Sequence, residues 1–450
     1  MNTEKLIKEY AKISESAEFW EIKSKTESFT QQNKSLKACS KSQTQGISAR
    51  ILANGCFGFA SSNDCSKKEQ VFKTAYNLAK NASRLKKEKT TIKELKHYQA
   101  KIKPKAKKDP FKISDQEKIK YLKDFNALFA LKEIKNSETT LSFSKSEKTY
   151  MNSDSANICQ ESIYAQLHNE IVSQTESVRS IRRAKKGYEL LKFNCADFAK
   201  ESEEKMKRLM SSKLAKPGKY NVVIDPDISG TFFHEAVGHA LEADFIREKS
   251  TCISMNEKAS IPELTLYDNP LLKDYWGSYE YDDEGIKAKK STLIKNGEVI
   301  NFINDKSSYF DVPGLKKTAN ARMQSIHDAP IPRMSNTQVK PGNYSKQELI
   351  EKAKNGLLVK GFSGGAVDTM TGIFSFKADE AFLIKNGKII KSFKGASLSG
   401  DLKQILKNIT GISKEFGNPY KGGMCGKKGQ SVPVSEKVPY ISVRDMNVGN

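Results

Sequence analysis

Two histidines that lie five residues apart constrain the fold of this chain more than any other feature. They begin and end the hexapeptide HEAVGH, residues 234–239, and the first is followed directly by Glu235. In an ideal α-helix of 3.6 residues per turn, this spacing turns the two rings about 140° apart. One wide turn with an i→i+5 hydrogen bond would bring them together, and Gly238 tolerates the backbone that such a turn requires. The sequence therefore predicts a π-bulge or a helix interruption near Val237 and Gly238.

The same hexapeptide carries the residue types of a catalytic zinc site. The chain has five histidines, and two of them lie here. Catalytic zinc commonly has three protein ligands and one water, and it makes that water acidic enough to supply hydroxide near neutral pH. We expect His234 and His239 to bind the metal and Glu235 to act as the general base. The pattern predicts a zinc-dependent peptidase.

The third ligand must come from another segment, and the spacing leaves the choice open. Glu242 lies three residues after His239 and can share its helix face, and Asp244 follows closely. Each is predicted either to be an alternative ligand or to support the ligands. Cys425 lies in a glycine-rich segment that would let a thiolate approach a metal, and thiolate is a good zinc ligand.

Composition indicates a globular protein without membrane-spanning helices. The chain has 450 residues, of which 37% are hydrophobic, enough for roughly two or three domains. No apolar run approaches the ~20 residues of a membrane helix, and the first residues lack the apolar stretch of a secretory signal. The seven cysteines include no CxxC pair, so we expect no disulfide framework. The expected compartment is the cytoplasm.

The net charge of +23 raises nucleic-acid binding as another role. Lysine outnumbers arginine by 66 to 10, however. Base readout favours arginine, whose planar group binds guanine and phosphate through two hydrogen bonds. We therefore expect nucleic acid not to be the main partner.

Periodicity and turn residues predict an α+β fold in three parts. Residues 1–108 form an N-terminal domain with an antiparallel sheet and helices, residues 109–218 a central α+β segment, and residues 219–450 a β-rich zinc peptidase domain that carries the HExxxH helix. The helical patterns cover 3–17, 68–85, 114–134, 188–214 and 402–412. The strand patterns cover 17–22, 46–52, 56–60, 139–172 and 221–225, with Asn-Gly turns at 54–55, 296–297 and 386–387. Residues 86–108 form a lysine-rich linker.

Longer motifs resemble one known family. The segment HEAVGHALEAD, residues 234–244, is similar to the signature of the TldD/PmbA family of metallopeptidases, also called modulators of DNA gyrase. The resemblance covers nearly the whole chain, through the segments GISAR (46–50), GFAS (58–61), GSYEYDDEG (277–285), PRMSNT (332–337), TGIFSF (371–376) and GGMCGKKGQ (422–430). Because the chain keeps HExxxH, it resembles the active TldD-like branch and not the PmbA-like branch, which lacks the motif.

The resemblance implies a site, a substrate class and a partner. It implies that Zn2+ is held by the two motif histidines and a C-terminal cysteine, here Cys425, with Glu235 as the catalytic carboxylate. It implies hydrolysis of unfolded or linear peptides with little sequence selection, in a homodimer or in a heterodimer with a PmbA-like chain. Arg333 and Asn336 could hydrogen-bond the backbone of such an extended peptide.

Three further expectations complete the sequence-based picture. The acidic run Asp282-Asp283-Glu284 is predicted to be a solvated hairpin tip, because charge clusters are usually solvated, and the alternative is a turn that tunes the site or binds the amino end of the substrate. One alternative function is a non-enzymatic regulator of a DNA-associated protein, which predicts salt-sensitive DNA binding. The other is a peptidase subunit that is active only with a PmbA-like partner.

Overall fold

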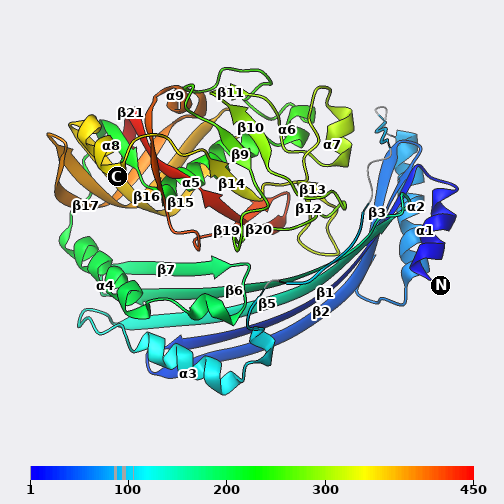
Figure 1. Cartoon of the computed structure of the whole chain (residues 1–450), viewed down its shortest axis with the longest axis horizontal. Helices are drawn as coiled ribbons and strands as arrows, with labels where there is room; N and C mark the ends of the chain where they lie inside the picture. Colours follow the sequence, from blue (N-terminus) through cyan, green and yellow to red (C-terminus); the bar gives the residue numbers. More distant parts are fainter. Residues whose placement is uncertain (1, 86–88, 94–97, 105, 450) are drawn as a thin grey trace.

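The computed structural model describes residues 2–85, 89–93, 98–104 and 106–449. It confirms the predicted α+β class. A long, curved sheet from the first half of the chain lies along one side of a β-rich second half (Figure 1). Within the described residues, no helix is long and apolar enough to cross a membrane.

The first sheet is antiparallel except at its β4 edge. Its strands follow the order β3-β2-β1-β5-β6-β4, and β7 also pairs with β6. They are β1 (Ser16–Gln32), β2 (Ser35–Ala53), β3 (Cys56–Ser62), β4 (Gln99–Ile102), β5 (Asn136–Asn152), β6 (Asn157–Val172) and β7 (Ser177–Ala184). The predicted strands 17–22 and 46–52 belong to β1 and β2, which are much longer. The turn predicted at Asn54-Gly55 is confirmed, with φ of 51° and 73°, as a tight hairpin requires.

Three amphipathic helices cover the convex face of this sheet (Figure 1). α1 (Thr3–Ala11) and α2 (Lys68–Leu85) pack on the face of β1 and β2 that carries Phe19. α3 (Asp115–Asn126) packs on the same face further along, where β1 carries Phe29. The odd-numbered residues of β1 therefore face these helices, and the even-numbered residues face the second half of the chain.

Two predicted helices are shorter in the structure. The helix predicted over 3–17 ends at Ala11, because the following residues turn into β1. The helix predicted over 114–134 ends at Asn126, whose side-chain amide donates to the carbonyl of Asn33 in the β1–β2 turn. In both cases tertiary contacts stop a pattern that continues in the sequence.

The lysine-rich linker before the predicted central part and the helix predicted at the end of that part also differ from expectation. The lysine-rich linker predicted over 86–108 lies partly outside the described residues, and its described part contributes β4 to the sheet. The helix predicted over 188–214 is divided into a short 3-10 turn (Tyr188–Leu191) and α4 (Cys195–Ser211). Residues 1–108 and 109–218, which were expected to form two separate parts, thus contribute strands to one sheet.

Two six-stranded sheets and several short helices make up most of the second half. The strand orders are β17-β16-β15-β8-β21-β18 and β11-β10-β9-β14-β20-β19. The strands are β8 (Gly218–Ile224), β9 (Leu266–Asp268), β10 (Ser291–Lys295), β11 (Glu298–Val299), β12 (Ala321–Arg322), β13 (Ile331–Pro332), β14 (Asn336–Val339), β15 (Gly356–Val367), β16 (Ile373–Lys385), β17 (Lys388–Asp401), β18 (Ile409–Phe416), β19 (Gly423–Lys427), β20 (Gln430–Lys437) and β21 (Pro439–Gly449). The helices are α5 (Pro226–Thr231), α6 (Ala243–Arg247), α7 (Lys306–Asp311), α8 (Lys346–Ala353) and α9 (Leu402–Lys407).

The core of this half surrounds the segment that carries the histidines. Phe233, Val237 and Leu241 are fully buried within the cluster formed by the two sheets. The Asn-Gly hairpins predicted at 296–297 and 386–387 are confirmed. The helix predicted over 402–412 is wrong in its second half, because Ile409 begins β18.

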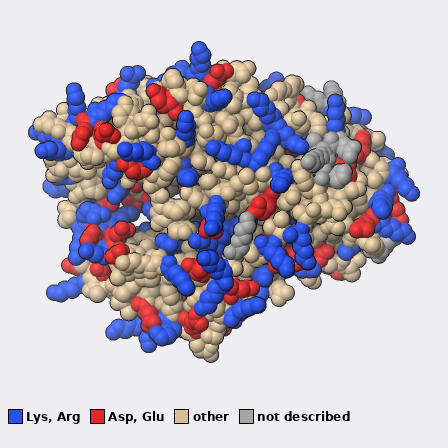
Figure 2. Space-filling view, viewed as in Figure 1, with Lys and Arg blue, Asp and Glu red and all other residues tan. Residues whose placement is uncertain are grey.

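Positive charge is spread over the face of the molecule seen in Figure 2. In Figure 2, lysine and arginine side chains occur across the whole visible face and alternate with acidic side chains. They do not gather there into one continuous basic groove of the kind that would follow a nucleic-acid backbone.

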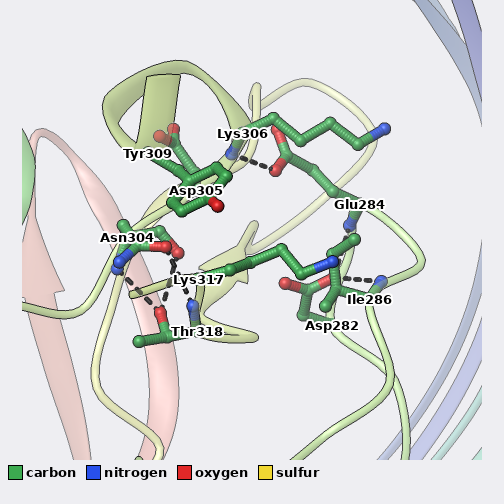
Figure 3. A pocket seen from close by; sticks show the side chains of 9 residues that line it. All are labelled: Asp282, Glu284, Ile286, Asn304, Asp305, Lys306, Tyr309, Lys317 and Thr318. Carbon is green, nitrogen blue, oxygen red and sulfur yellow. Dashed lines mark hydrogen bonds between the residues drawn. The ribbon is translucent and has the colours of Figure 1, made fainter. Parts of the chain in front are cut away.

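The acidic run 282–284 is buried, so its prediction as a solvated hairpin tip is wrong. Its three residues are between 2% and 8% exposed. The first sheet covers it: Trp20 Nε1 donates to the Asp283 carbonyl at 2.6 Å, and Lys148 pairs with the Asp283 carboxylate at 2.6 Å. Figure 3 shows the other side, where Glu284 accepts a hydrogen bond from the Lys306 backbone at 2.7 Å.

A buried charge network joins the two halves at this point. Arg50 on β2 lies between Glu18 on β1 and Glu284, with an N–O distance of 2.5 Å to each. Lys306 at the start of α7 binds Glu18 at 2.7 Å, and the Tyr150 hydroxyl donates to Glu18 at 2.8 Å. All five side chains are buried. Paired charges therefore hold the sheet against the second half.

Candidate metal centre

The hexapeptide forms the wide helical turn that its spacing predicts. After α5, the chain continues as a π-helix over Phe232–Gly238, and the His239 N–H donates to the His234 carbonyl. The two imidazole centroids lie 5.3 Å apart. Glycine at 238 leaves room for Met334, whose Sδ would lie 2.1 Å from a Cβ there. The prediction of a π-bulge is confirmed.

Three potential ligands converge at this turn. Ligand atoms of His234, His239 and Cys425 all lie within 4.8 Å of one another, and the three side chains are buried. Cys425 Sγ is 3.3 Å from His239 Nε2. In a tetrahedral zinc site, bonds of about 2.1 Å to nitrogen and about 2.3 Å to sulfur place such atoms about 3.6 Å apart. The observed spacing therefore suits a zinc ion.

His234 supplies the strongest structural reason to assign a metal here. Its Nε2 is buried and has no hydrogen-bond partner among the described residues. Its Nδ1 lies 3.5 Å from Thr337 Oγ1 and 3.8 Å from Glu436 Oε1. A buried nitrogen without a partner is unfavourable, and a metal ion would satisfy it.

Glu242 orients His239 from behind. Its fully buried carboxylate lies 2.9 Å from His239 Nδ1. This contact keeps a proton on Nδ1 and leaves Nε2, the nitrogen beside Cys425, available to a metal. Burial alone would raise the pKa of Glu242, but His239 and Lys427 lower it to about 2. The structure thus places Glu242 behind His239, in a position from which it can orient that ring.

β19 brings Cys425 to the histidines across 186 residues of sequence. Burial favours the thiol, but His234 and His239 outweigh that effect and lower the pKa of Cys425 to about 5. The thiolate, which is the form that binds metals, therefore predominates at neutral pH. Alternation along the strand points Cys425 inward and leaves Met424 51% exposed on the other side.

Lys427 ties β19 to the segment that follows the histidines. Its Nζ lies 3.0 Å from Glu242 and 2.7 Å from Asp244. Asp244 also pairs with Lys428 at 3.0 Å. Asp244 was predicted as an alternative ligand or a support, and the structure turns its carboxylate toward these lysines and not toward the ligand cluster.

Glu235 differs from the ligands in being open to solvent. Its side chain is 39% exposed, and its carboxylate lies 3.7 Å from His239 Nε2. A carboxylate in this position can exchange a proton with a water molecule beside the ligand cluster.

Arg333 and Asn336, predicted to contact a peptide, are buried in the protein itself. Arg333 donates to the carbonyls of Cys425 and Gln430 and so braces the β19–β20 hairpin. The Asn336 amide donates to the Asn269 carbonyl at 2.8 Å. Both side chains are fully buried, so this placement does not support their predicted contact with substrate.

Three neighbours of the cluster were not predicted from the sequence. Thr337 and Lys427 lie inside motif segments that the sequence did highlight, although without a role. Glu436, on β20, lies outside those segments. Burial and the nearby Glu235 raise the pKa of Glu436 to about 7, although His234 lowers it.

Family models match both ends of the chain. The model described as the PmbA/TldA metallopeptidase C-terminal domain matches residues 217–450, and the model for PmbA/TldA metallopeptidase domain 1 matches residues 18–84. The first of these covers more than half of the chain and contains the whole candidate metal centre.

Two relatives carry protease names. The chain is 32% identical over 398 residues to a metalloprotease of Methanocaldococcus jannaschii, and the match covers 87% of each protein. It is 31% identical over 309 residues to a zinc metalloprotease TldD homolog of Saccharolobus solfataricus, covering 67% of this chain and 68% of that protein.

A solved structure shares the fold. The crystal structure of a putative modulator of a DNA gyrase from Thermotoga maritima matches with a TM-score of 0.80 at 16% identity, and the match covers 100% of both chains. At this identity the likeness shows the fold alone and carries no information about the chemistry.

Proposed function

This chain belongs to the PmbA/TldA (TldD/PmbA) metallopeptidase family and is a metalloprotease, and we propose that it hydrolyses unfolded or linear peptides with zinc as its metal. The observation that carries the proposal is the buried His234, His239 and Cys425 cluster beside an open carboxylate. A zinc ion bound there supplies Lewis acidity for activating water and stabilising negative charge.

Each residue of the site has a distinct part in this proposal. His234, His239 and Cys425 hold the metal, and two histidines with one thiolate favour zinc among the common divalent ions. Glu242 keeps the proton on His239 Nδ1. Glu235 accepts a proton from the attacking water and returns it to the leaving amine.

The substrate binds in our proposal as an extended strand beside β19. β19 lies at the end of its sheet, so its outer edge carries backbone groups that another strand can match. Met424 is exposed at this edge, and a Cβ at Gly426 would meet no atom within 4 Å. Backbone pairing uses groups common to all peptides, which accounts for weak sequence selection. This role replaces the one predicted for Arg333 and Asn336.

The decisive experiment distinguishes loss of the general base from loss of the metal. The variant Glu235→Gln should bind as much zinc as the original protein, measured by mass spectrometry, while its turnover of an unstructured, internally quenched peptide falls by about 10²–10⁴-fold. Glu263→Gln, an exposed site away from the cluster, serves as the matched control. Turnover in Glu235→Gln within twofold of the control would contradict the proposal.

The oligomeric state is part of the same proposal, as a homodimer or a heterodimer with a PmbA-like chain. Size-exclusion chromatography of the zinc-loaded chain, alone and mixed with a PmbA-like protein, tests it. Cleavage by the chain alone would identify a self-sufficient enzyme. Cleavage that requires the mixture would identify a subunit that depends on its partner.

A further inference from the structure

Uncharged hydroxyl side chains line the middle of the concave face of the first sheet. We call them the hydroxyl face. They are Ser24, Thr26, Ser28 and Thr30 on β1, Ser40, Ser42 and Thr44 on β2, and Thr140, Ser142, Ser144 and Ser146 on β5. They occupy eleven of the fourteen even-numbered positions in 22–30, 38–46 and 140–146, and none of the fourteen is charged. A chain with 29% charged residues would place about four charges there.

Within these stretches of the three strands, charge is confined to the opposite face. Lys23, Lys25 and Glu27 alternate with the hydroxyls along β1, and Lys41 and Lys145 do so on its two neighbours. Solvent alone would accept charged side chains on either face. The sorting of charge to one face therefore needs a reason specific to the concave side.

The hydroxyl face is turned toward the second half of the chain (Figure 1). At one end, Trp20 on the same side of β1 donates to the Asp283 carbonyl. At the neighbouring strand, the Gln160 amide on β6 donates to the Tyr281 carbonyl at 3.3 Å. Both contacts lie at the same end, because Trp20 is opposite Tyr150 and Gln160 is opposite Lys148. Beyond them the hydroxyls remain partly or fully exposed. The face is thus bounded at that end by contacts between the two halves but is not covered by them.

Contacts made by β6 and β7 connect this face to the strand that carries Cys425. Tyr164 on β6 lies opposite Ser144, and its ring contacts Trp276 at 5.1 Å between centroids. Trp276 packs against Gly422, whose carbonyl accepts a hydrogen bond from Arg183 on β7 at 2.7 Å. Gly422 directly precedes β19. A polypeptide that reaches β19 therefore has the hydroxyl face beside it.

We propose that the hydroxyl face is a docking surface for the extended polypeptide substrate, next to the cleavage site. The inference rests on the proposed peptidase function and deepens it. A hydroxyl both donates and accepts a hydrogen bond, so it can serve the N–H and the C=O groups of any peptide. The absence of charge removes discrimination between acidic and basic side chains.

Five of these eleven hydroxyls are available for such contacts, and the other six are paired with each other. Three cross-strand pairs bind each other: Thr26 with Ser42 at 2.6 Å, Ser28 with Ser142 at 2.9 Å, and Thr30 with Thr140 at 3.0 Å. The other five have no hydrogen-bond partner among the described side chains. Strand spacing of about 4.8 Å sets the hydroxyls in rows across the sheet, so one extended chain can meet several of them.

The test places charge on each face in turn. Ser42→Asp/Ser146→Asp charges the concave side, and Gln43→Asp/Gln45→Asp charges the convex side of β2 as a matched control. Affinity is measured by fluorescence anisotropy for two labelled linear peptides, one with lysines and one with glutamates at the same positions. The zinc-loaded Glu235→Gln background prevents cleavage. Ser42→Ala/Ser146→Ala removes two hydroxyls without adding charge.

The concave aspartates should weaken binding of the glutamate peptide and strengthen binding of the lysine peptide, each by about fivefold. The convex pair should change each affinity by less than about twofold, because its charges lie across the sheet. The alanine pair should weaken both peptides alike. The proposal would be overturned if the two aspartate pairs had equal effects on peptide affinity, or if both concave variants left the affinity unchanged. It would also be overturned if the concave variants lost a dimer without losing peptide binding. Failure of the original protein to cleave either peptide would instead contradict the proposed function.

Discussion

Removal of Arg50 tests the idea that paired charges hold the first sheet against the metal-bearing half. The change Arg50→Met keeps much of the side-chain volume and deletes the cation. In the original protein the guanidinium lies 2.5 Å from carboxylate oxygens of both Glu18 and Glu284. The side chains of these two acids are 1% and 0% exposed. In the variant they share Lys306 as their remaining cation.

The expected loss of stability follows from leaving a buried carboxylate without its partner. Breaking a buried ion pair by removing one member typically costs about 3–5 kcal/mol. Glu284 has the greater loss, because Lys306 Nζ binds Glu18 at 2.7 Å, whereas among the described residues Glu284 keeps the Lys306 backbone N–H as its remaining hydrogen-bond donor. We therefore expect Arg50→Met to be destabilised by about 3–5 kcal/mol.

The assay is urea unfolding followed by tryptophan emission. The chain has two tryptophans, and Trp20 is fully buried within 5.7 Å of the Arg50 guanidinium. A Trp276→Phe background makes the signal report on this contact alone. Arg84→Met, an exposed arginine on α2, is the matched control and should change stability by less than about 0.5 kcal/mol.

A compensating variant decides between charge and packing. Arg50→Met/Glu284→Gln leaves Glu18 paired with Lys306, so it should be more stable than Arg50→Met alone. The difference between the stability change of the double variant and the sum of the two single changes measures the coupling between Arg50 and Glu284. A loss below about 1 kcal/mol in Arg50→Met, or strict additivity of the two changes, would refute the reasoning.

Three other outcomes are expected. Glu242→Gln should weaken zinc binding about 10–100-fold, measured by competition with a chelating dye, because the support of His239 is lost; unchanged affinity would contradict that role. Cys425→Ser in cobalt-substituted protein should lose the sulfur-to-cobalt absorption band, and a retained band would exclude Cys425 as a ligand. Burial raises the pKa of Glu18, but Arg50 and Lys306 outweigh it and lower the pKa from 4.5 to about 2. The contribution of Glu18 to the free energy of unfolding is therefore complete above pH ~4.5 and is lost as the pH falls toward ~2. Acid titration of metal-free protein should show this loss, and Glu18→Gln should lack it.

Local patterns in the sequence predicted local structure well. The Asn-Gly turns follow from the backbone preferences of a few adjacent residues, and the wide turn follows from the spacing of the two histidines within one hexapeptide. Helix ends were predicted less well. The helix predicted over 114–134 stops at Asn126 because that side chain binds the β1–β2 turn, a contact that no local pattern contains.

Side-chain environment was the hardest property to predict. The acidic run 282–284 and the pair Arg333 and Asn336 have the polar character of exposed residues. All of them are buried, since strands from distant segments close over them. Polar groups are buried when their hydrogen bonds are satisfied, and the partners here come from elsewhere in the chain.

The sequence by itself determined the two histidines, the glutamate between them and the wide turn, because all of these depend on spacing within one hexapeptide. The family resemblance implied Cys425 as the third ligand, but spacing left the choice open. Only the tertiary structure decided that Cys425 Sγ lies beside His239 Nε2, that Glu242 lies behind that histidine and that Asp244 faces Lys427. Those contacts depend on how β19 lies against a helical segment far away in the chain. A spacing of 186 residues carries no information about such an approach.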